Sequence, residues 1–201
     1  MKTTYIIIII ILAGGLVLGL MGYRNKLSVS NDKQSSNNFN SVGKNTHQLK
    51  DNPYEELRNK ALKVSPKDLG LSLNENTVVY GVVMDWEMGG AIATTVTYQT
   101  GDASLYLSSG GGVIGGGGHK NVNNAAKRFV NLAQTFINVA LRTETTPLPE
   151  KNSVKFYLLT NKGIYVGQET MNNFENSSSV WLKLFEEGNN VLSELRVISE
   201  K

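Results

Sequence analysis

An apolar run near the N-terminus is the feature that most constrains how this chain can fold. Ile6–Gly22 reads IIIIIILAGGLVLGLMG, contains no charged residue, and lies between Lys2 and Arg24. As an α-helix it would span about 25 Å at ~1.5 Å per residue, close to a ~30 Å hydrocarbon core. Six consecutive isoleucines leave no polar face for a helix on a globular surface. The run therefore predicts a transmembrane helix, with Tyr5 and Tyr23 at the two membrane interfaces.

A cleaved secretory signal is the competing interpretation, because a short basic segment precedes the apolar run. The run is longer than a usual signal core and no A-x-A pattern comes after it, so we favour an uncleaved anchor, residues 1–24. Its orientation stays open. Positive charge after the run favours a cytoplasmic C-terminal side, whereas the short N-terminal tail of a signal-anchor favours export of the C-terminal domain. We expect the exported side, with secretion after cleavage as the alternative.

The basic charge of the chain is concentrated beside this segment. Residues 1–52 carry six Lys or Arg against two Asp, whereas residues 53–201 carry fourteen against fifteen acidic residues. The excess therefore suits anionic lipid headgroups, and the remainder lacks the basic surface of a nucleic-acid-binding protein. Residues 25–52 are rich in Asn, Ser, Lys and Gln, so we expect a disordered linker in which His47 is solvated.

Residues 53–201 are expected to form a single domain. Asn52-Pro53-Tyr54-Glu55 combines a cap, a proline for the first helical turn and an acidic residue, which is typical of a helix start. Runs of β-branched and aromatic residues between glycine-containing turns predict strands. The expected strands are 77–88, 91–99, 103–109, 153–160 and 163–167. The expected helices are 53–63, about 121–142 and about 177–187, the last interrupted by Gly188-Asn189-Asn190.

The helix near 121–142 has the clearest pattern. Its apolar residues recur at spacings of three and four, namely Val122, Ala126, Phe129, Ala133, Phe136 and Ala140. Its polar residues fall on the opposite face, namely Lys127, Asn131, Gln134 and Asn138. This helix should pack across the sheet. The chain is therefore expected to be α+β, with helices on a mainly antiparallel sheet of about five strands. In element order it resembles the profilin-like and roadblock-like modules, a resemblance that concerns the fold alone.

The run GGGVIGGGG, residues 110–118, is the most unusual local feature. Gly110, Gly112 and Gly115 satisfy G-x-G-x-x-G, but the next helix begins too late and no acidic residue occurs at the expected distance. Residues 71–119 also contain no Lys or Arg, which disfavours an anionic ligand. The glycines either permit positive φ and close packing, or provide a surface free of side chains for a partner. The candidate binding residues are Gly110, Gly111, Gly112, Gly115, Gly116, Gly117 and Gly118.

Asp85-Trp86-Glu87 is the second candidate site. In a strand the two carboxylates share one face about 7 Å apart, a spacing that suits acid–base work or a hard cation, while Trp86 faces the core. A solvated strand face explains the same pattern. His119 could serve as a base toward a nearby serine, although no nucleophile-elbow motif is present.

Two functions are therefore compatible with the sequence. The first is a membrane-tethered, non-catalytic binding domain for an unidentified partner, expected to be a protein, without cofactor, metal or nucleic acid. The second is a small hydrolase or cation-binding domain that uses Asp85 and Glu87 with His119, beside the loop Gly110–Gly118. The chain has no cysteine, which excludes thiolate metal sites and cysteine nucleophiles. A common cavity around the three residues would favour the second function.

Overall fold

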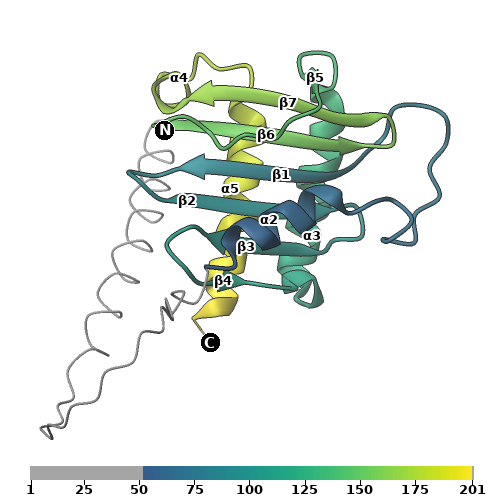
Figure 1. Cartoon of the computed structure of the whole chain (residues 1–201), viewed down its shortest axis with the longest axis horizontal. Coiled ribbons are helices and arrows are strands. Elements are labelled where there is room, and N and C mark those ends of the chain that lie inside the picture. Colours follow the sequence, from purple (N-terminus) through teal and green to yellow (C-terminus); the bar gives the residue numbers. More distant parts are fainter. Residues whose placement is uncertain (1–51, 201) are drawn as a thin grey trace, which may run out of the picture.

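The structure, a computed structural model, describes residues 52–200, and a seven-stranded antiparallel sheet forms the centre of this part (Figure 1). The strands are β1 (Val79–Glu87), β2 (Ile92–Tyr98), β3 (Ala103–Leu107), β4 (Gly112–Val113), β5 (Leu141–Thr143), β6 (Ser153–Thr160) and β7 (Gly163–Thr170). Their order across the sheet is β4-β3-β2-β1-β6-β7-β5. Every pair of neighbours is antiparallel. The expected α+β class is confirmed.

Helices cover both faces of this sheet. The helices are α2 (Tyr54–Lys63), α3 (Lys120–Ala133), α4 (Met171–Glu175) and α5 (Leu182–Ser199), with 3₁₀ turns η1 (Gly116–Gly118) and η2 (Gln134–Phe136). In Figure 1, α2 crosses one face of the sheet, whereas α3 and α5 lie behind it. Every residue of β1 is consequently buried, since a central strand covered on both sides has no solvated face.

The alternation along β1 separates two cores. Val82, Met84 and Trp86 belong to the larger core beneath α3 and α5, whereas Val83 belongs to the smaller core beneath α2. The prediction that Trp86 faces a core is confirmed, and its ring packs edge-on against Phe185 of α5 at 5.2 Å. The interpretation that Asp85 and Glu87 line a solvated strand face was wrong, because both residues are buried on the face that α2 covers.

The prediction of about five strands missed the two edge strands. β4 contains two residues, one of them glycine, and β5 contains three residues within a segment that reads as helix. The prediction that the helix starting near Asn121 runs to about Arg142 was wrong, because α3 ends at Ala133 and the chain turns after η2. Strand pairing with β7 overrides the helical periodicity there, since Leu141 lies opposite Val166. The predicted faces of α3 are confirmed within the helix itself.

The predicted interruption of the last helix was also wrong. α5 runs without a break through Gly188 to Ser199. A Cβ at Gly188 would lie 2.6 Å from the sulfur of Met84, so glycine lets this helix approach the sheet closely. The residue that usually weakens a helix is retained here because tertiary packing requires its small size.

The predicted anchor, residues 1–24, and most of the predicted linker, residues 25–52, lie outside the described residues. Within residues 52–200 no helix is both long enough and apolar enough to cross a membrane.

Candidate functional site

Helix α2 carries one charged residue on its apolar face. Tyr54, Arg58, Ala61 and Leu62 are the buried residues of this helix, and they recur at the spacing of a single helical face. Arg58 therefore points down onto the sheet rather than into solvent, and its side chain is only 6% exposed. A buried guanidinium requires a partner.

Asp85 on β1 is that partner. One carboxylate oxygen of Asp85 accepts hydrogen bonds from Nε and Nη2 of Arg58, at 2.9 and 2.6 Å. Its other oxygen accepts the hydroxyl of Thr94 at 2.6 Å. The hydroxyls of Thr94 and Tyr54 are hydrogen-bonded to each other at 2.8 Å. Asp85 is fully buried, and both of its oxygens are occupied by a structural network.

Burial beside Asp85 raises the pKa of two tyrosines in contact with this network. Burial, reinforced by the negative charge of Asp85, raises the pKa of Tyr54 and of Tyr157 to about 12. Burial alone would lower the pKa of Arg58, but its hydrogen bond to Asp85 and the charge of Asp85 raise it above the ordinary value. The tyrosines consequently stay neutral at physiological pH, and Arg58 stays charged.

Glu87 shares the α2 face of β1 with Asp85 but has separate partners. One oxygen accepts the backbone N–H of Gly90 and the other accepts that of Asn152, both at 2.6 Å. The carboxylate thereby joins the β1–β2 turn to the start of β6, and Glu87 is only 9% exposed. Both oxygens serve the fold.

His119 lies elsewhere, at the start of α3. It is exposed, and its imidazole forms no hydrogen bond with the described residues. The preceding η1 packs against the Ala103 end of β3, since a Cβ at Gly116 would meet the Ala103 carbonyl. Thr94 of β2 pairs with Asp85 on one side and with Tyr106 of β3 on the other. Asp85 therefore lies near the Tyr106 end of β3, away from the Ala103 end. Asp85 and Glu87 also face α2, whereas α3 covers the opposite face. The three candidate catalytic residues therefore do not converge.

The Gly-rich loop contains glycines of two kinds. At Gly112, Gly116 and Gly117 an added Cβ would lie within 2.0 to 2.6 Å of a neighbouring atom, so these positions are closely packed. At Gly110, Gly111, Gly115 and Gly118 nothing lies within 4 Å of an added Cβ. The loop thus combines the packing role and the open surface that the sequence left as alternatives.

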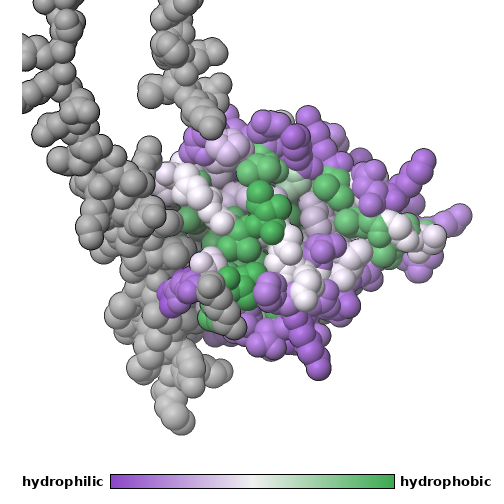
Figure 2. Space-filling model, turned by 90° about the horizontal axis from the view of Figure 1, so that it is seen from below, coloured by the Kyte–Doolittle hydropathy of each residue, from purple (hydrophilic) through white to green (hydrophobic). Residues whose placement is uncertain are grey.

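An apolar patch accompanies this loop. Figure 2 shows apolar side chains gathered on the face seen from below the view of Figure 1, at the β4 edge of the sheet. Ile114, which directly follows β4, is 69% exposed, and Val197 in the last turns of α5 is also exposed. Ile114 thus lies beside β4, at the opposite edge of the sheet from β5.

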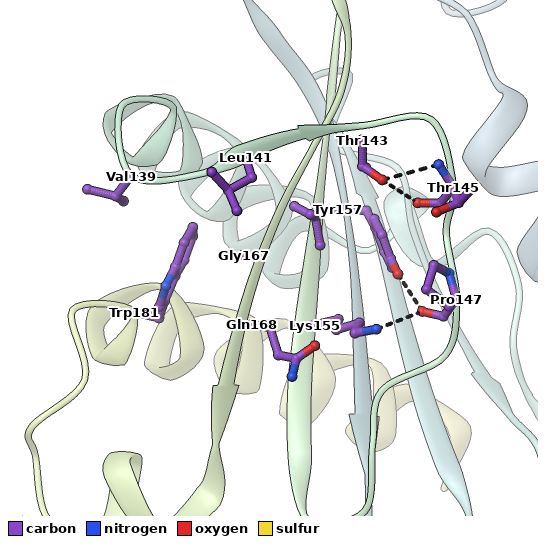
Figure 3. Close-up of a pocket in the computed structure, with 11 residues that line it drawn as sticks. Val139, Leu141, Thr143, Thr145, Pro147, Lys155, Tyr157, Gly167, Gln168 and Trp181 are labelled. Carbon is purple, nitrogen blue, oxygen red and sulfur yellow. Dashed lines mark hydrogen bonds between the residues drawn. The ribbon is translucent and has the colours of Figure 1, made fainter.

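A groove lies at the β5 edge of the sheet (Figure 3). Its volume is about 380 Å³. We call it the β7 groove, and its lining residues are Val139, Leu141, Thr143, Thr145, Pro147, Lys155, Tyr157, Val166, Gly167, Gln168 and Trp181. In Figure 3, Val139, Leu141 and Trp181 form one side, and Lys155 and Tyr157 point toward Pro147 on the other. The lining combines six apolar or glycine residues with five that carry polar groups, namely Thr143, Thr145, Lys155, Tyr157 and Gln168. Ligand pockets likewise combine apolar walls with polar groups that orient the ligand.

The loop between β5 and β6, residues 144–152, forms one wall of this groove and is held by side chains of the sheet and of α2. Arg58 donates to the carbonyl of Thr146 at 3.0 Å, and the hydroxyl of Tyr157 donates to that of Pro147. The ammonium of Lys155 donates to the carbonyls of Pro147 and Leu148 at 3.4 and 3.2 Å. The buried ion pair therefore also fixes a wall of the groove.

The sequence did not indicate the groove, because its residues come from separate segments. One signal for the ion pair was present, namely an arginine on the apolar face of a predicted helix. Read together with Asp85 in a buried strand, it could have indicated a buried pair. No comparable local signal marked the β7 groove, since it depends on where β5 ends relative to β7.

A smaller cavity of about 260 Å³ adjoins Glu87 and is lined in part by Trp86, Asn152 and Glu175. Neither Asp85 nor His119 lines it. Among residues 52–200, no three acidic or imidazole side chains are grouped so that they could hold a metal ion. Comparison with protein-family models, curated proteins and solved structures finds no significant match. The function is consequently inferred from the sequence and the geometry of this chain.

Proposed function

We propose that this chain is a membrane-tethered, non-catalytic binding domain whose ligand occupies the β7 groove. Tethering by Ile6–Gly22, with the domain on the exported side, is inferred from the sequence alone, as is the profilin-like and roadblock-like element order. Secretion after cleavage remains the alternative. The partner class expected from the sequence, a protein, is retained.

The groove is the single observation that carries this proposal. Its volume of about 380 Å³ lies within the roughly 300–1,000 Å³ of ligand pockets. Leu141 is 73% exposed and Val139 is 54% exposed, so apolar surface remains uncovered beside it. A ligand that covers these side chains gains the free energy of removing apolar surface from water.

The groove's chemistry favours binding over catalysis. Among the described residues, its lining contains no carboxylate, imidazole or thiol that could act as a general base. Tyr157, whose pKa is raised to about 12 by burial, is neutral and donates to a backbone carbonyl. The hydrolase alternative has no support in the positions of Asp85, Glu87 and His119.

Site-specific photo-crosslinking tests the proposal. A photoreactive amino acid is introduced into the full chain at Leu141 in the groove, at Ile114 in the Gly-rich loop, and at Lys127 on the exposed face of α3 as a control. We expect a cross-linked species from Leu141 and none from Lys127. Cross-linking at Ile114 instead of Leu141 would transfer the proposal to the loop Gly110–Gly118, and cross-linking at neither position would refute it.

A further inference from the structure

We propose that the β7 groove binds the C-terminal end of an extended peptide chain, which adds as a strand to β7 and directs its carboxylate to Lys155. This inference rests on the proposed function, because it assumes that the groove is the binding site. It adds the class of ligand and the way in which the ligand is held. Three features of the groove lead to it.

The first feature is an open sheet edge. β5 pairs with β7 only from Ile164 to Val166, but β7 continues to Thr170. By the same register Val139 would lie opposite Gln168, yet the N–H of Val139 is donated to Phe136 within a turn. Among residues 52–200, the last part of β7 therefore has no paired strand on this side.

The backbone direction along β7 shows which groups this edge presents. The N–H of Met171 is donated to the carbonyl of Asn152, toward β6, and the N–H of Thr170 is donated to the side chain of Glu169. Because successive residues of a strand alternate their hydrogen-bonding direction, Gln168 directs both its N–H and its C=O away from β6. An unpaired N–H and C=O at a sheet edge are a template for an added strand.

The second feature is an apolar site beside this edge. A Cβ at Gly167 would lie 2.2 Å from the ring of Trp181, so only glycine allows the indole to reach the strand there. Val139 and Leu141 lie on the same side of the groove as Trp181 in Figure 3. An apolar side chain of an added strand that points to the Gly167 face would meet Trp181. One that points to the other face would meet Leu141, because Leu141 pairs with Val166 and Val166 pairs with Tyr157.

The third feature is charge. Lys155 is the only charged residue among those that line the groove. It lies directly opposite Gln168 in the β6–β7 pairing, beside the open backbone. Its ammonium has three N–H groups, and its two bonds to loop carbonyls are long, at 3.4 and 3.2 Å. A carboxylate is a stronger partner for this cation than a carbonyl. The C-terminus of a peptide offers one group for each feature: backbone N–H and C=O groups for the open edge of β7, an apolar side chain for the apolar site, and a carboxylate for Lys155.

Fluorescence anisotropy with the full chain in detergent micelles tests this inference. The probes are fluorescein-labelled pentapeptides of alternating Thr and Val that end in Val, Leu, Phe or Ser, each as the free acid and as the C-terminal amide. We expect the acids with an apolar last residue to bind at least about tenfold more tightly than their amides. Lys155→Met should abolish this preference, whereas Lys151→Met, an exposed lysine outside the groove, should preserve it.

N-methylation of the peptide tests strand addition without altering the protein. Methyl groups placed on successive amides should weaken binding at alternate positions only, because every second amide faces β7. Equal affinity of acid and amide, or a uniform effect of N-methylation, would overturn the inference. If no peptide binds but Leu141 still cross-links, the peptide inference fails and the binding function stands. If both experiments give nothing, both proposals fail.

Discussion

Asp85 and Arg58 form a buried ion pair, and removing one partner should be far more damaging than removing both. Asp85→Ala leaves an uncompensated guanidinium between α2 and the sheet, so the free energy of unfolding should fall by about 3–5 kcal/mol. The double variant Arg58→Met, Asp85→Leu should recover most of this loss. Urea unfolding followed by tryptophan fluorescence measures both changes. Glu56→Ala, which removes an exposed ion pair with Lys60, is the control. A loss at Asp85 no larger than this control would contradict the structural role.

The raised pKa values of the tyrosines near Asp85 lead us to expect a loss of stability at alkaline pH. The pKa of Tyr54 and of Tyr157 is about 12 in the folded chain against an ordinary 10.0. Between these values the unfolded chain loses protons that the folded chain keeps, so stability is intact below pH 10 and falls as pH rises toward 12. The urea midpoint should therefore decrease between pH 10 and pH 12. In Tyr54→Phe this decrease should be smaller, and an unchanged slope would show that Tyr54 does not contribute.

At the scale of elements, single glycines decide how closely helices and strands approach one another. Gly188 allows α5 to lie against Met84, whereas Gly118 has nothing within 4 Å of an added Cβ. Gly188→Ala should lower the free energy of unfolding by about 1–3 kcal/mol through overpacking, despite the better helix propensity of alanine. Gly118→Ala, the matched control, should change it by less than about 0.5 kcal/mol. Chemical denaturation of the two variants measures both changes. Equal effects would contradict the close approach of α5.

For the whole molecule, the central prediction concerns membrane attachment. The full chain should remain with membranes after alkaline carbonate washing, because Ile6–Gly22 is long and apolar enough to span a bilayer. Deletion of residues 1–24 should release the chain into the soluble fraction without changing its thermal unfolding midpoint. Fractionation and thermal unfolding of both chains test this. Retention of the deleted chain on membranes would assign attachment to residues 25–201.

The sequence by itself determined the α+β class, five of the seven strands among residues 52–200, and the buried face of α3. These features depend on periodicity and turn residues, which act over a few positions. It also placed Asp85 and Glu87 on one face of a strand. It could not tell that α2 covers this face, because the partner Arg58 is 27 residues away from Asp85.

Only the tertiary structure decided the rest. From sequence, Gly188 predicts a break in the last helix, but its small size is required by the contact with Met84. Leu141 lies next to a helical pattern, but it pairs with Val166 in the sheet. The β7 groove exists because β5 is shorter than β7 and because Trp181 lies against Gly167. These contacts join residues that are distant along the chain, and the free energy of burying them together outweighs local preference. The apolar run Ile6–Gly22 differs from these features, because its local composition by itself predicts a membrane anchor.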